Sequence, residues 1–359
     1  MLHSFFKDLK VVELASVLAG PAVGMFFSEL GAEVIKIENK ATRGDVTRHW
    51  KLPSEDPKSD YSAYYCSVNW NKEVHILDLK KKADRQKVHQ FVESADIVIS
   101  NFKPGSAEKF GMDYATLKAI HPAIIYAEIT AFGEHIDKPA FDIVLQAEAG
   151  FLYMTGEADR DPVRMPVALI DLLAAHQLKE AILIALLHRE RTGKGSFVTT
   201  SLFESAIASL ANQATNWLMA GHIPQRMGSE HPNIAPYGDI FRTKDNKMIT
   251  LAVGTEKQFA ALCDSLNNPS LSKDKRFETN TLRVKNRSSL KIELEQLIGN
   301  LNQKELNELF YSRRVPAGNI NNMQEVFELP QVGDMILEEK QSDGKMSQRV
   351  KTVAFRAKM

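Results

Sequence analysis

The chain has 359 residues, enough for about two domains of the usual size with a sizeable buried core. Its 45 lysines and arginines balance 45 aspartates and glutamates, and 44% of the residues are hydrophobic, as in an average globular protein. This balance excludes a disordered, collagen-like or coiled-coil chain. It also argues against a nucleic-acid partner and against docking on a membrane, since both require a field of one sign. Any anionic ligand must therefore be held by local basic side chains.

Cysteine usage and hydropathy bear on the compartment. Cys66 and Cys263 are too few for a disulfide framework or a cysteine-rich zinc site, and we expect no metal. The longest apolar run, residues 181–187, is far shorter than the roughly 20 residues of a membrane-spanning helix. The amino end does not resemble a signal peptide. We therefore expect a soluble, cytoplasmic protein.

The first 130 residues alternate between strand-like and helix-like patterns. Apolar runs predict strands at residues 11–14, 34–38, 74–79, 96–100 and 124–129, and helical periodicity predicts helices at residues 20–30, 83–94 and 107–120. Strands separated by helices indicate crossover units, and hence an α/β fold with a Rossmann-like, mostly parallel sheet. Residues 40–70 lack this rhythm, so we predict a long functional loop there.

Further along, residues 163–169 alternate as in a strand, although Pro166 weakens that pattern. A strong helix follows from Asp171 to a basic turn before Gly193, and a second long helix is predicted over residues 202–219. Prolines and glycines between residues 224 and 238 then mark a domain boundary. Predicted strands at 238–242 and 248–253, with helices of their own, indicate a smaller α+β domain.

Several common catalytic motifs are absent from the sequence. It contains no G-x-S-x-G elbow, no P-loop, no H-E-x-x-H and no C-x-x-C, which argues against elbow-type serine hydrolases, P-loop enzymes and familiar zinc enzymes. The opening strand–turn–helix–strand pattern ends at Glu38 and resembles a dinucleotide fold. However, Gly20 and Gly24 do not make G-x-G-x-x-G, which argues against a nicotinamide cofactor.

Asp171 stands where the pattern places the carboxyl end of a strand and the start of a helix, a position at which open α/β folds bind ligands. One interpretation makes it only the helix N-cap. The other makes it a carboxylate nucleophile that the helix dipole keeps ionised at neutral pH. The local pattern is compatible with both.

Ordered blocks of sequence resemble the class III CoA-transferases (CaiB/BaiF), which include formyl-CoA and carnitine CoA-transferases. They are residues 11–38 (VVELASVLAGPAVGMFFSELGAEVIKIE), 44–48 (GDVTR), 71–80, 101–111, 139–156 with PAFD at 139–142, Asp171, 185–195 and 231–237 (HPNIAPY). The resemblance implies coenzyme A as the group carried, an acyl-CoA and a small carboxylic acid as substrates, and an interlocked homodimer. It also implies a large domain made of residues 1–222 and a return segment, 321–359, around a smaller domain at 223–320.

The resemblance further implies a mechanism and a set of contacts. Asp171 matches the catalytic aspartate, which attacks the thioester to give an aspartyl anhydride and then an aspartyl-CoA thioester. The residues that match the family's CoA-binding positions are Val17, Leu18, Ala19, Asn39, Leu77, Lys80, Lys109, Phe110, Thr130, Phe132 and Gly133. Taken singly, the lysines could be ordinary surface residues and the apolar ones ordinary core residues. Several relatives carry arginine at the position of Asn39, so phosphate binding could pass to Lys40, Arg43 or Arg48.

Departures from the family keep alternatives open. Related racemases use a histidine in a G-H-D-I run, and here the run is AFDI, with Phe141 unable to move a proton. The glycine-rich lid of the formyl-CoA relatives is reduced to Gly228, and the carboxyl end is short. A CoA-transferase is the leading hypothesis. An acyl-CoA racemase or epimerase and a non-catalytic CoA-binding protein are the alternatives.

Overall fold

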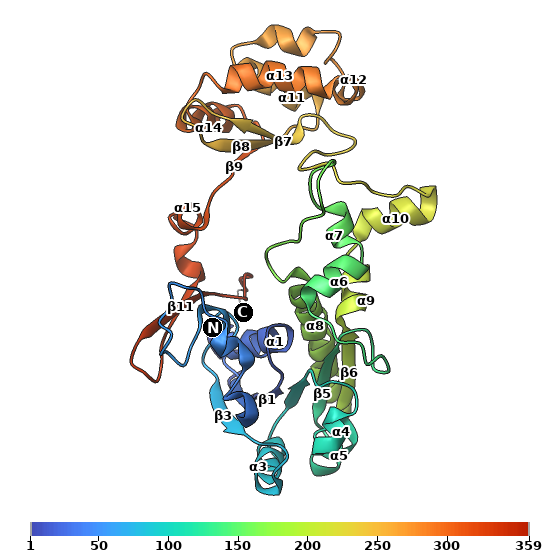
Figure 1. Cartoon of the computed structure of the whole chain (residues 1–359), viewed down its shortest axis with the longest axis vertical. Helices are drawn as coiled ribbons and strands as arrows, with labels where there is room; N and C mark the ends of the chain where they lie inside the picture. The colour runs from blue at the N-terminus through green and yellow to red at the C-terminus, as the bar shows by residue number, and fades with distance from the viewer. Residues whose placement is uncertain (1, 358–359) are drawn as a thin grey trace. The chain divides into compact units, whose positions relative to one another are not determined.

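Six parallel strands form the central sheet, in the order β3-β2-β1-β4-β5-β6 (Figure 1). The computed structural model describes residues 2–357. The strands are β1 (Lys10–Leu14), β2 (Glu33–Asn39), β3 (Glu73–Leu77), β4 (Ile97–Ser100), β5 (Ile125–Thr130) and β6 (Ser196–Ser201). Val12 of β1 pairs with Ile35 of β2 on one side and with Val98 of β4 on the other. The predicted α/β fold with a parallel sheet is confirmed.

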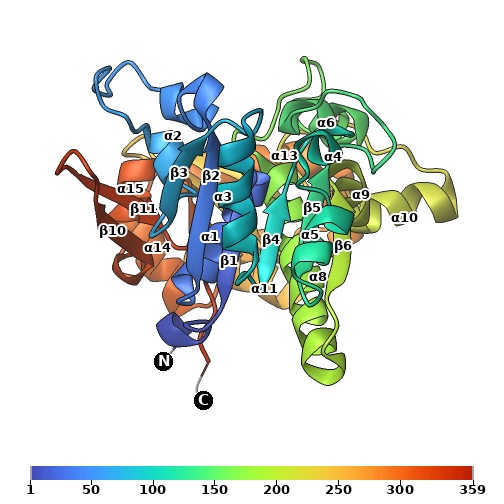
Figure 2. The same ribbon diagram turned by 90° about the horizontal axis from the view of Figure 1, so that it is seen from below.

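Helices cover both faces of this sheet (Figure 2). One core packs the sheet against α1 (Ala19–Glu29), α6 (Asp142–Glu148), α8 (Leu169–Thr192) and α9 (Leu202–Ala208). The core on the other face includes side chains of α3 (Lys82–Val92) and α5 (Tyr114–Ile120). Shorter or more peripheral helices are α2 (Ala63–Cys66), α4 (Ser106–Phe110), α7 (Phe151–Met154) and α10 (Ala211–Ala220). The strand ends are thereby left as the accessible edge of the sheet.

Contacts divide the chain into two compact units, and the larger one is discontinuous. It comprises Met1–Phe151, Arg164–His222 and Gly333–Met359, and the smaller one comprises Leu152–Val163 and Ile223–Val332. Whether the expected domains at 1–222, 223–320 and 321–359 fold as independent bodies stays a prediction. Among residues 2–357 no helix is long and apolar enough to span a membrane.

The smaller unit contains an antiparallel sheet and a layer of helices. Its strands are β7 (Tyr237–Arg242), β8 (Met248–Ala252) and β9 (Ala317–Asn319), and its helices are α11 (Glu256–Ser265), α12 (Asn280–Lys285), α13 (Arg287–Ile298), α14 (Gln303–Ser312) and α15 (Met323–Phe327). Phe241, Phe259 and Phe277 lie in its core. Short 3-10 helices occur in the two units at Leu2–Ser4, Lys40–Thr42, Val46–His49, Pro269–Lys273 and Gly333–Met335.

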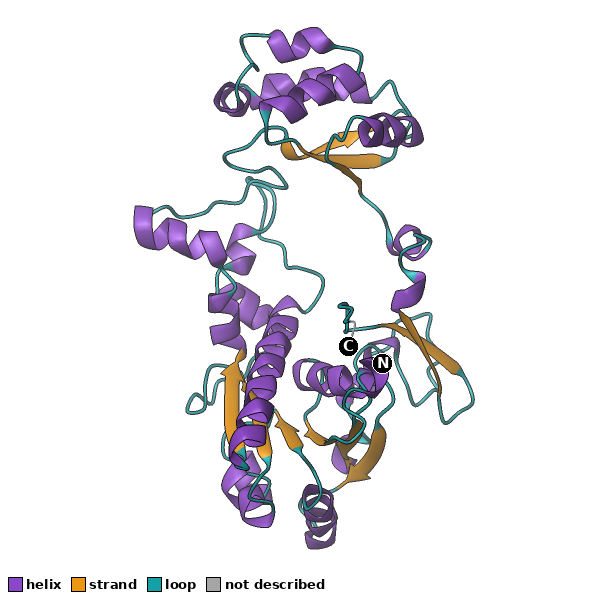
Figure 3. Ribbon diagram, turned by 180° about the vertical axis from the view of Figure 1, so that it is seen from behind, coloured by secondary structure: helices purple, strands orange, loops and turns teal. Residues whose placement is uncertain are grey.

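The carboxyl end of the chain returns to the larger unit as a hairpin of β10 (Ile336–Lys340) and β11 (Met346–Val350) (Figure 3). Arg349 donates to the backbone oxygen of Asn69. The buried carboxylate of Glu29 accepts the backbone N–H groups of Thr352 at 2.7 Å and of Val353 at 3.0 Å. These bonds fix the segment after the hairpin on helix α1.

Some predicted elements were wrong, for identifiable reasons. Residues 163–169 form no strand, because Pro166 has no N–H and the backbone N–H of Met165 bonds to the side chain of Gln146 instead. The predicted helix over 107–120 is two helices, separated by Gly111 at a φ of 66°. The helix over 202–219 is also split, at Ala211 with a φ of 48°. Strand β6 was missed because its polar residues hide the apolar pattern.

Candidate active site

Two cavities in the larger unit lie side by side at the carboxyl ends of the strands. The first, about 420 Å³, is lined by the ends of β1, β2 and β3 together with residues 101–110. The second, about 260 Å³, is lined by the turn after β1, by residues 129–141 and by Asp171. Four residues line both cavities: Ser16, Asn101, Phe102 and Lys103. The sheet order reverses between β1 and β4, and ligands of open α/β folds bind at such a point.

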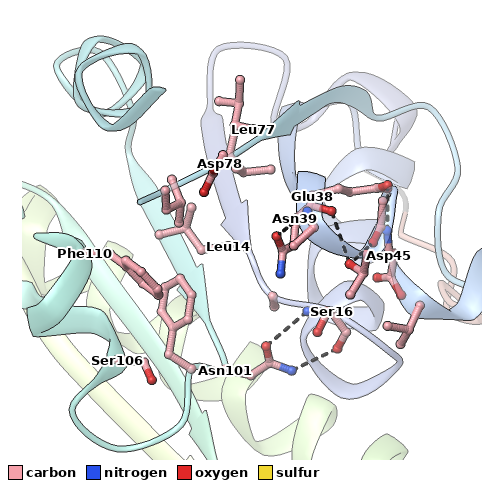
Figure 4. A pocket seen from close by; sticks show the side chains of 18 of the residues that line it. Leu14, Ser16, Glu38, Asn39, Asp45, Leu77, Asp78, Asn101, Ser106 and Phe110 are labelled. Atoms are coloured by element: carbon pink, nitrogen blue, oxygen red, sulfur yellow. Dashed lines mark hydrogen bonds between the residues drawn. The ribbon is translucent and has the colours of Figure 1, made fainter. Parts of the chain in front are cut away.

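A pair of hydrogen bonds fixes the boundary between the two cavities. The backbone N–H of Ser16 donates to Asn101 Oδ1 at 3.1 Å, and Asn101 Nδ2 donates to the backbone oxygen of Ser16 at 2.9 Å (Figure 4). The end of β1 is thereby fastened to the end of β4. A long ligand that enters both cavities would pass over this junction.

Asp171 is the third residue of helix α8 and not its N-cap, so that interpretation is excluded. The capping position is Ala168, whose side chain makes no cap bond. The backbone N–H groups of Ile170 and Asp171 instead donate to Asp142 Oδ1 at 2.7 Å and 3.3 Å. Because a carboxylate from another helix caps α8, the carboxyl group of Asp171 is free to face the second cavity.

The carboxyl group of Asp171 is isolated from cations. Asp171 is 9% exposed, and its carboxyl group makes no hydrogen bond or ion pair within residues 2–357. Burial, and to a smaller degree the Asp142 carboxylate, raises the pKa of Asp171 to about 7. Burial therefore opposes the ionisation of Asp171 that the helix dipole is expected to favour. A poorly solvated carboxylate is a strong nucleophile once it has lost its proton.

Asp142 is held in place by a hydrogen bond within its own helix, α6. Gln146, one helical turn later in α6, donates from Nε2 to Asp142 Oδ2 at 2.5 Å. Its Oε1 accepts the backbone N–H of Met165 at 2.9 Å. This i, i+4 pair ties the segment before α8 to α6 and positions Asp171. Both residues lie in the block 139–156 that resembles the family, and this role was not predicted, although the i, i+4 spacing of an acid and an amide could have suggested it.

Tyr64, in helix α2, was also missed by the sequence analysis. Burial and the nearby carboxylates, Asp171 first among them, raise the pKa of Tyr64 to about 12. The phenol therefore keeps its proton at neutral pH and remains a hydrogen-bond donor. Its ring contacts Trp50 edge to face at 5.1 Å.

Most of the predicted CoA contacts line one of the two cavities. Asn39, Leu77, Lys80 and Phe110 line the first, and Val17, Leu18, Ala19, Thr130 and Gly133 line the second. Two predicted residues line neither. Lys109 is exposed on α4, and Phe132 packs in the core against Phe203 with ring centroids 5.6 Å apart. The contacts themselves stay predictions.

The alternative cations for phosphate binding are placed elsewhere. Arg48 is buried and bonded to both carboxylate oxygens of Glu38, at 2.7 Å and 2.8 Å, so it is not free for a phosphate. Arg43 lines a separate polar cavity of about 580 Å³. Asn39 caps a 3-10 turn by accepting the backbone N–H of Ala41 at 2.9 Å. Lys80 and Lys103 are the basic residues that line the first cavity.

Buried ion pairs stand behind the wall of the first cavity. Lys36 Nζ lies 2.8 Å from Glu13 Oε1 and 3.2 Å from Asp45 Oδ2. Burial alone would lower the pKa of Lys36, yet the two carboxylates raise it. Burial likewise opposes ionisation of Glu38 and Asp45, but Arg48 and Lys36 hold the pKa values of these carboxyls below their usual range. The pairs fasten residues 45–48 to strands β1 and β2.

Comparisons with known proteins agree with this geometry. The model of CoA-transferase family III matches residues 6–359. A succinate–glutarate CoA-transferase from Agrobacterium fabrum is 38% identical over 336 residues, covering 91% of this chain and 82% of that protein. The succinyl-CoA:glutarate CoA-transferase of Homo sapiens is 37% identical over 330 residues, covering 91% of this chain and 74% of that protein. The crystal structure of a CaiB/BaiF family protein from Brucella suis matches with a TM-score of 0.86 at 38% identity, covering 97% of this chain and 92% of that one.

The family match extends over nearly the whole chain, and the parallel sheet, the carboxyl-end cavities and the isolated aspartate fit the chemistry of that family. Within the described residues, no group of three or more histidine, cysteine, aspartate or glutamate side chains is arranged to hold a metal ion. The chain belongs to CoA-transferase family III and is an enzyme that moves CoA between an acyl-CoA and a carboxylic acid.

Proposed function

We propose that Asp171 is the nucleophile of CoA transfer. The observation that carries this proposal is the buried carboxyl group of Asp171, which lines the second cavity and has no cation beside it among the residues that the structure describes. A structural carboxylate at this depth would be expected to have a cation or several N–H donors as partners. Burial without compensation instead raises the basicity of the group, which is what a nucleophilic carboxylate needs.

The reaction proceeds in balanced steps. An oxygen of the Asp171 carboxylate adds to the acyl carbon of the donor, the C–S bond breaks, and an aspartyl anhydride and CoA thiolate form. The thiolate then adds to the aspartyl carbonyl carbon and expels the donor acid as a carboxylate, which leaves an aspartyl-CoA thioester. The acceptor acid repeats the two steps in reverse order and leaves as the new acyl-CoA. No step requires a metal or an oxidant.

CoA fits across the junction of the two cavities. We place its nucleotide in the first cavity, with Asn39, Leu77, Lys80 and Phe110 as contacts, and its pantetheine arm over Ser16 into the second. Val17, Leu18, Ala19, Thr130 and Gly133 would then surround the thioester end beside Asp171. The shared lining residues support this path, since a single extended ligand can occupy both cavities at once. The reaction requires that bulk water be kept from the acyl group, since water would hydrolyse the anhydride.

The substrates are proposed as short dicarboxylic acids and their CoA thioesters. The relatives from Agrobacterium fabrum and Homo sapiens act on succinate and glutarate, as their names say. The second cavity carries Lys103 and Lys138 in its lining, and an ammonium group can bind the distal carboxylate of such an acid.

Reduced thiols at Cys66 and Cys263 suit a cytoplasmic enzyme.

An interlocked homodimer is proposed as the working assembly. Large apolar side chains are exposed on two helices: Leu183, Ile184 and Leu187 on α8, and Trp217, Leu218 and Met219 on α10. Exposed apolar surface of this extent is typical of a protein interface. Size-exclusion chromatography with light scattering is expected to give twice the mass of the chain, and a monomer at micromolar concentration would contradict this.

The racemase alternative lacks a residue for proton transfer at the aligned position. Phe141 lines the second cavity and is 62% exposed, so the position that holds a histidine in racemases presents a ring without a titratable proton. We expect no deuterium from D2O in the α-carbon of recovered acyl-CoA. Deuterium incorporation without CoA transfer would favour the racemase.

The direct test of the proposed function is a pair of matched variants in a transfer assay with succinyl-CoA and labelled glutarate. Asp171→Ala is expected to lose about a thousandfold or more in kcat while it still binds CoA in calorimetry. Asp137→Asn is the control, because Asp137 lines the same cavity but is exposed. Transfer by Asp171→Ala at more than a tenth of the wild-type rate would refute the proposal.

A further inference from the structure

The turn that joins β1 to α1 contains a strained residue. Val17 has a φ of 73°, in the left-handed region. For a β-branched side chain this conformation is an outlier, because the two γ-methyl groups crowd the backbone. Such a conformation persists only where the surrounding structure holds it, and it is found preferentially at functional sites. The turn lies at the second cavity, where both Val17 and Asp171 belong to the lining.

A buried carboxylate holds the strained residue. The backbone N–H of Val17 donates to Asp45 Oδ2 at 3.2 Å. The same oxygen lies 3.2 Å from Lys36 Nζ, and the side chains of both Lys36 and Asp45 have no solvent exposure. Lys36 Nζ also donates to the backbone oxygen of Ala15 at 3.0 Å, just before the turn. The turn is therefore held on both sides by one buried ion pair.

The other oxygen of Asp45 is also occupied. Oδ1 accepts the backbone N–H of Thr47 at 3.0 Å and its hydroxyl at 2.8 Å. An amide at this position has a single oxygen, which can serve either Thr47 or Val17 but not both. If that oxygen stays with Thr47, the amide nitrogen faces the N–H of Val17 and the ammonium of Lys36, which are both donors.

We infer that Asp45 is a positioning residue, which through the buried ion pair with Lys36 keeps Val17 in its strained conformation and thereby places residues 16–18 against the substrate beside Asp171. The inference rests on the proposed function, because it assigns the second cavity to the thioester. Asp45 belongs to the lining of the first cavity, but its carboxylate has no solvent exposure, so it acts on the reacting end of the substrate through the turn. Loss of its hold lets the turn relax and leaves the reacting groups misplaced.

A double-mutant cycle for stability tests the hold without any assay of activity. Glycine adopts a positive φ without strain, so Val17→Gly is expected to raise the melting temperature of the wild-type protein by about 2–4 °C. In the Asp45→Asn background the turn has already relaxed, and Val17→Gly is expected to give no increase. Equal increases in the two backgrounds would overturn the inference. Asn267→Gly, at an exposed residue of the smaller unit with a φ of 54°, is the control and should add equally to both.

Kinetics then connect the turn to the reaction. Asp45→Asn is expected to lower kcat by about tenfold or more when Val17 is present, since a misplaced reactive geometry acts on the chemical step. With Val17→Gly as the reference, the same substitution should lower kcat by no more than about threefold, because the turn reaches its conformation without an anchor. A similar loss in both backgrounds would contradict the inference, whatever the change in KM.

The outcomes separate the two proposals and cover a failure to fold. An active Asp171→Ala variant would refute the nucleophile and leave the stability cycle readable. If Asp45→Asn alone does not fold, the double variant is compared with Val17→Gly directly. A folded double variant that retains at least about a third of the kcat of Val17→Gly supports the inference. A double variant that does not fold shows that Asp45 is needed beyond the turn and overturns it.

Discussion

Two sets of buried carboxylates lie in the larger unit, and their pKa values shift in opposite directions although burial raises both. Asp171 has no cation beside it within residues 2–357, and burial raises its pKa to about 7. Burial also opposes the charge on Glu38 and Asp45, but Arg48 and Lys36 hold the pKa values of these carboxyls below their usual range. The paired carboxylates fasten the cavity walls, and the unpaired one keeps the basicity that covalent chemistry needs. The carboxylates that have a cation partner thus stabilise the fold, and the carboxylate without one has the proposed role in the reaction.

The largest effect is expected where a paired carboxylate is neutralised. Glu38→Gln leaves the guanidinium of Arg48 buried without its counterion, and we expect a loss of about 3–5 kcal/mol in the free energy of unfolding. Urea denaturation measures this loss. Glu33→Gln is the matched control, since Glu33 pairs with Lys10 at 3.5 Å on the surface and should cost less than about 0.5 kcal/mol. Equal costs for the two variants would show that the buried pair does not fasten the wall.

Neutralising the unpaired carboxylate of Asp171 is expected to increase the free energy of unfolding instead of lowering it. The raised pKa means that the folded protein binds the Asp171 proton more tightly than the unfolded chain does. The favourable contribution of that proton is complete below the unfolded pKa of about 4 and is lost as the pH rises through about 7. Asp171→Asn should therefore stabilise the protein by about 4 kcal/mol at pH 8, and the gain should vanish near pH 4. A variant less stable than the wild type at pH 8 would contradict this account.

The charge on Asp142 is expected to shift the pH dependence of the reaction. In the wild type, kcat/KM for the acyl-CoA should rise with pH through about 7 as Asp171 loses its proton. Asp142→Asn removes a neighbouring negative charge and keeps an oxygen for the N–H groups of Ile170 and Asp171. The midpoint should then move to lower pH by less than about one unit, because burial, the larger cause, is unchanged. A midpoint that stays in place or moves upward would show that Asp142 does not influence Asp171.

The smallest effects are expected for substitutions of exposed lysines. They test whether the CoA contacts are better predicted by the family resemblance or by the residues that line the cavities. Lys80→Ala and Lys103→Ala should raise KM for CoA thioesters by about three- to tenfold at low salt, with little change in kcat. Lys109→Ala should change KM by less than about twofold, since Lys109 does not line either cavity. A larger effect for Lys109 than for Lys80 would reverse this assignment.

The sheet was predictable because buried parallel strands have short apolar runs that the sequence shows directly. The predicted strands at residues 11–14, 34–38 and 96–100 coincide with β1, β2 and β4, and their bounds differ from the observed ones by no more than one or two residues. Strand β6 was not predicted because four of its six residues are serines and threonines. The segment before α8 was predicted as a strand from its alternating apolar residues, but the backbone of Met165 bonds to the side chain of Gln146 and not to a neighbouring strand.

The resemblance predicted which residues form the candidate site, but it did not predict their hydrogen bonds and ion pairs. Asp171 could be named from its ordered surroundings, yet the sequence gives no sign that Asp142, 29 positions earlier, supplies the cap of α8. Likewise the sequence placed Arg48 among candidate phosphate ligands, and only the fold brings it to Glu38. Pairing between distant charged residues depends on tertiary contacts, which no local pattern encodes.

The most direct measurement is a search for the covalent intermediate. The wild-type enzyme is incubated with succinyl-CoA and hydroxylamine, which converts an activated aspartyl carbonyl into a stable hydroxamate, and its peptides are analysed by mass spectrometry. We expect a hydroxamate on Asp171, formed only when the acyl-CoA is present, and none on Asp142 or Asp137. Full transfer activity with no modification of Asp171, or with modification of another residue, would contradict it.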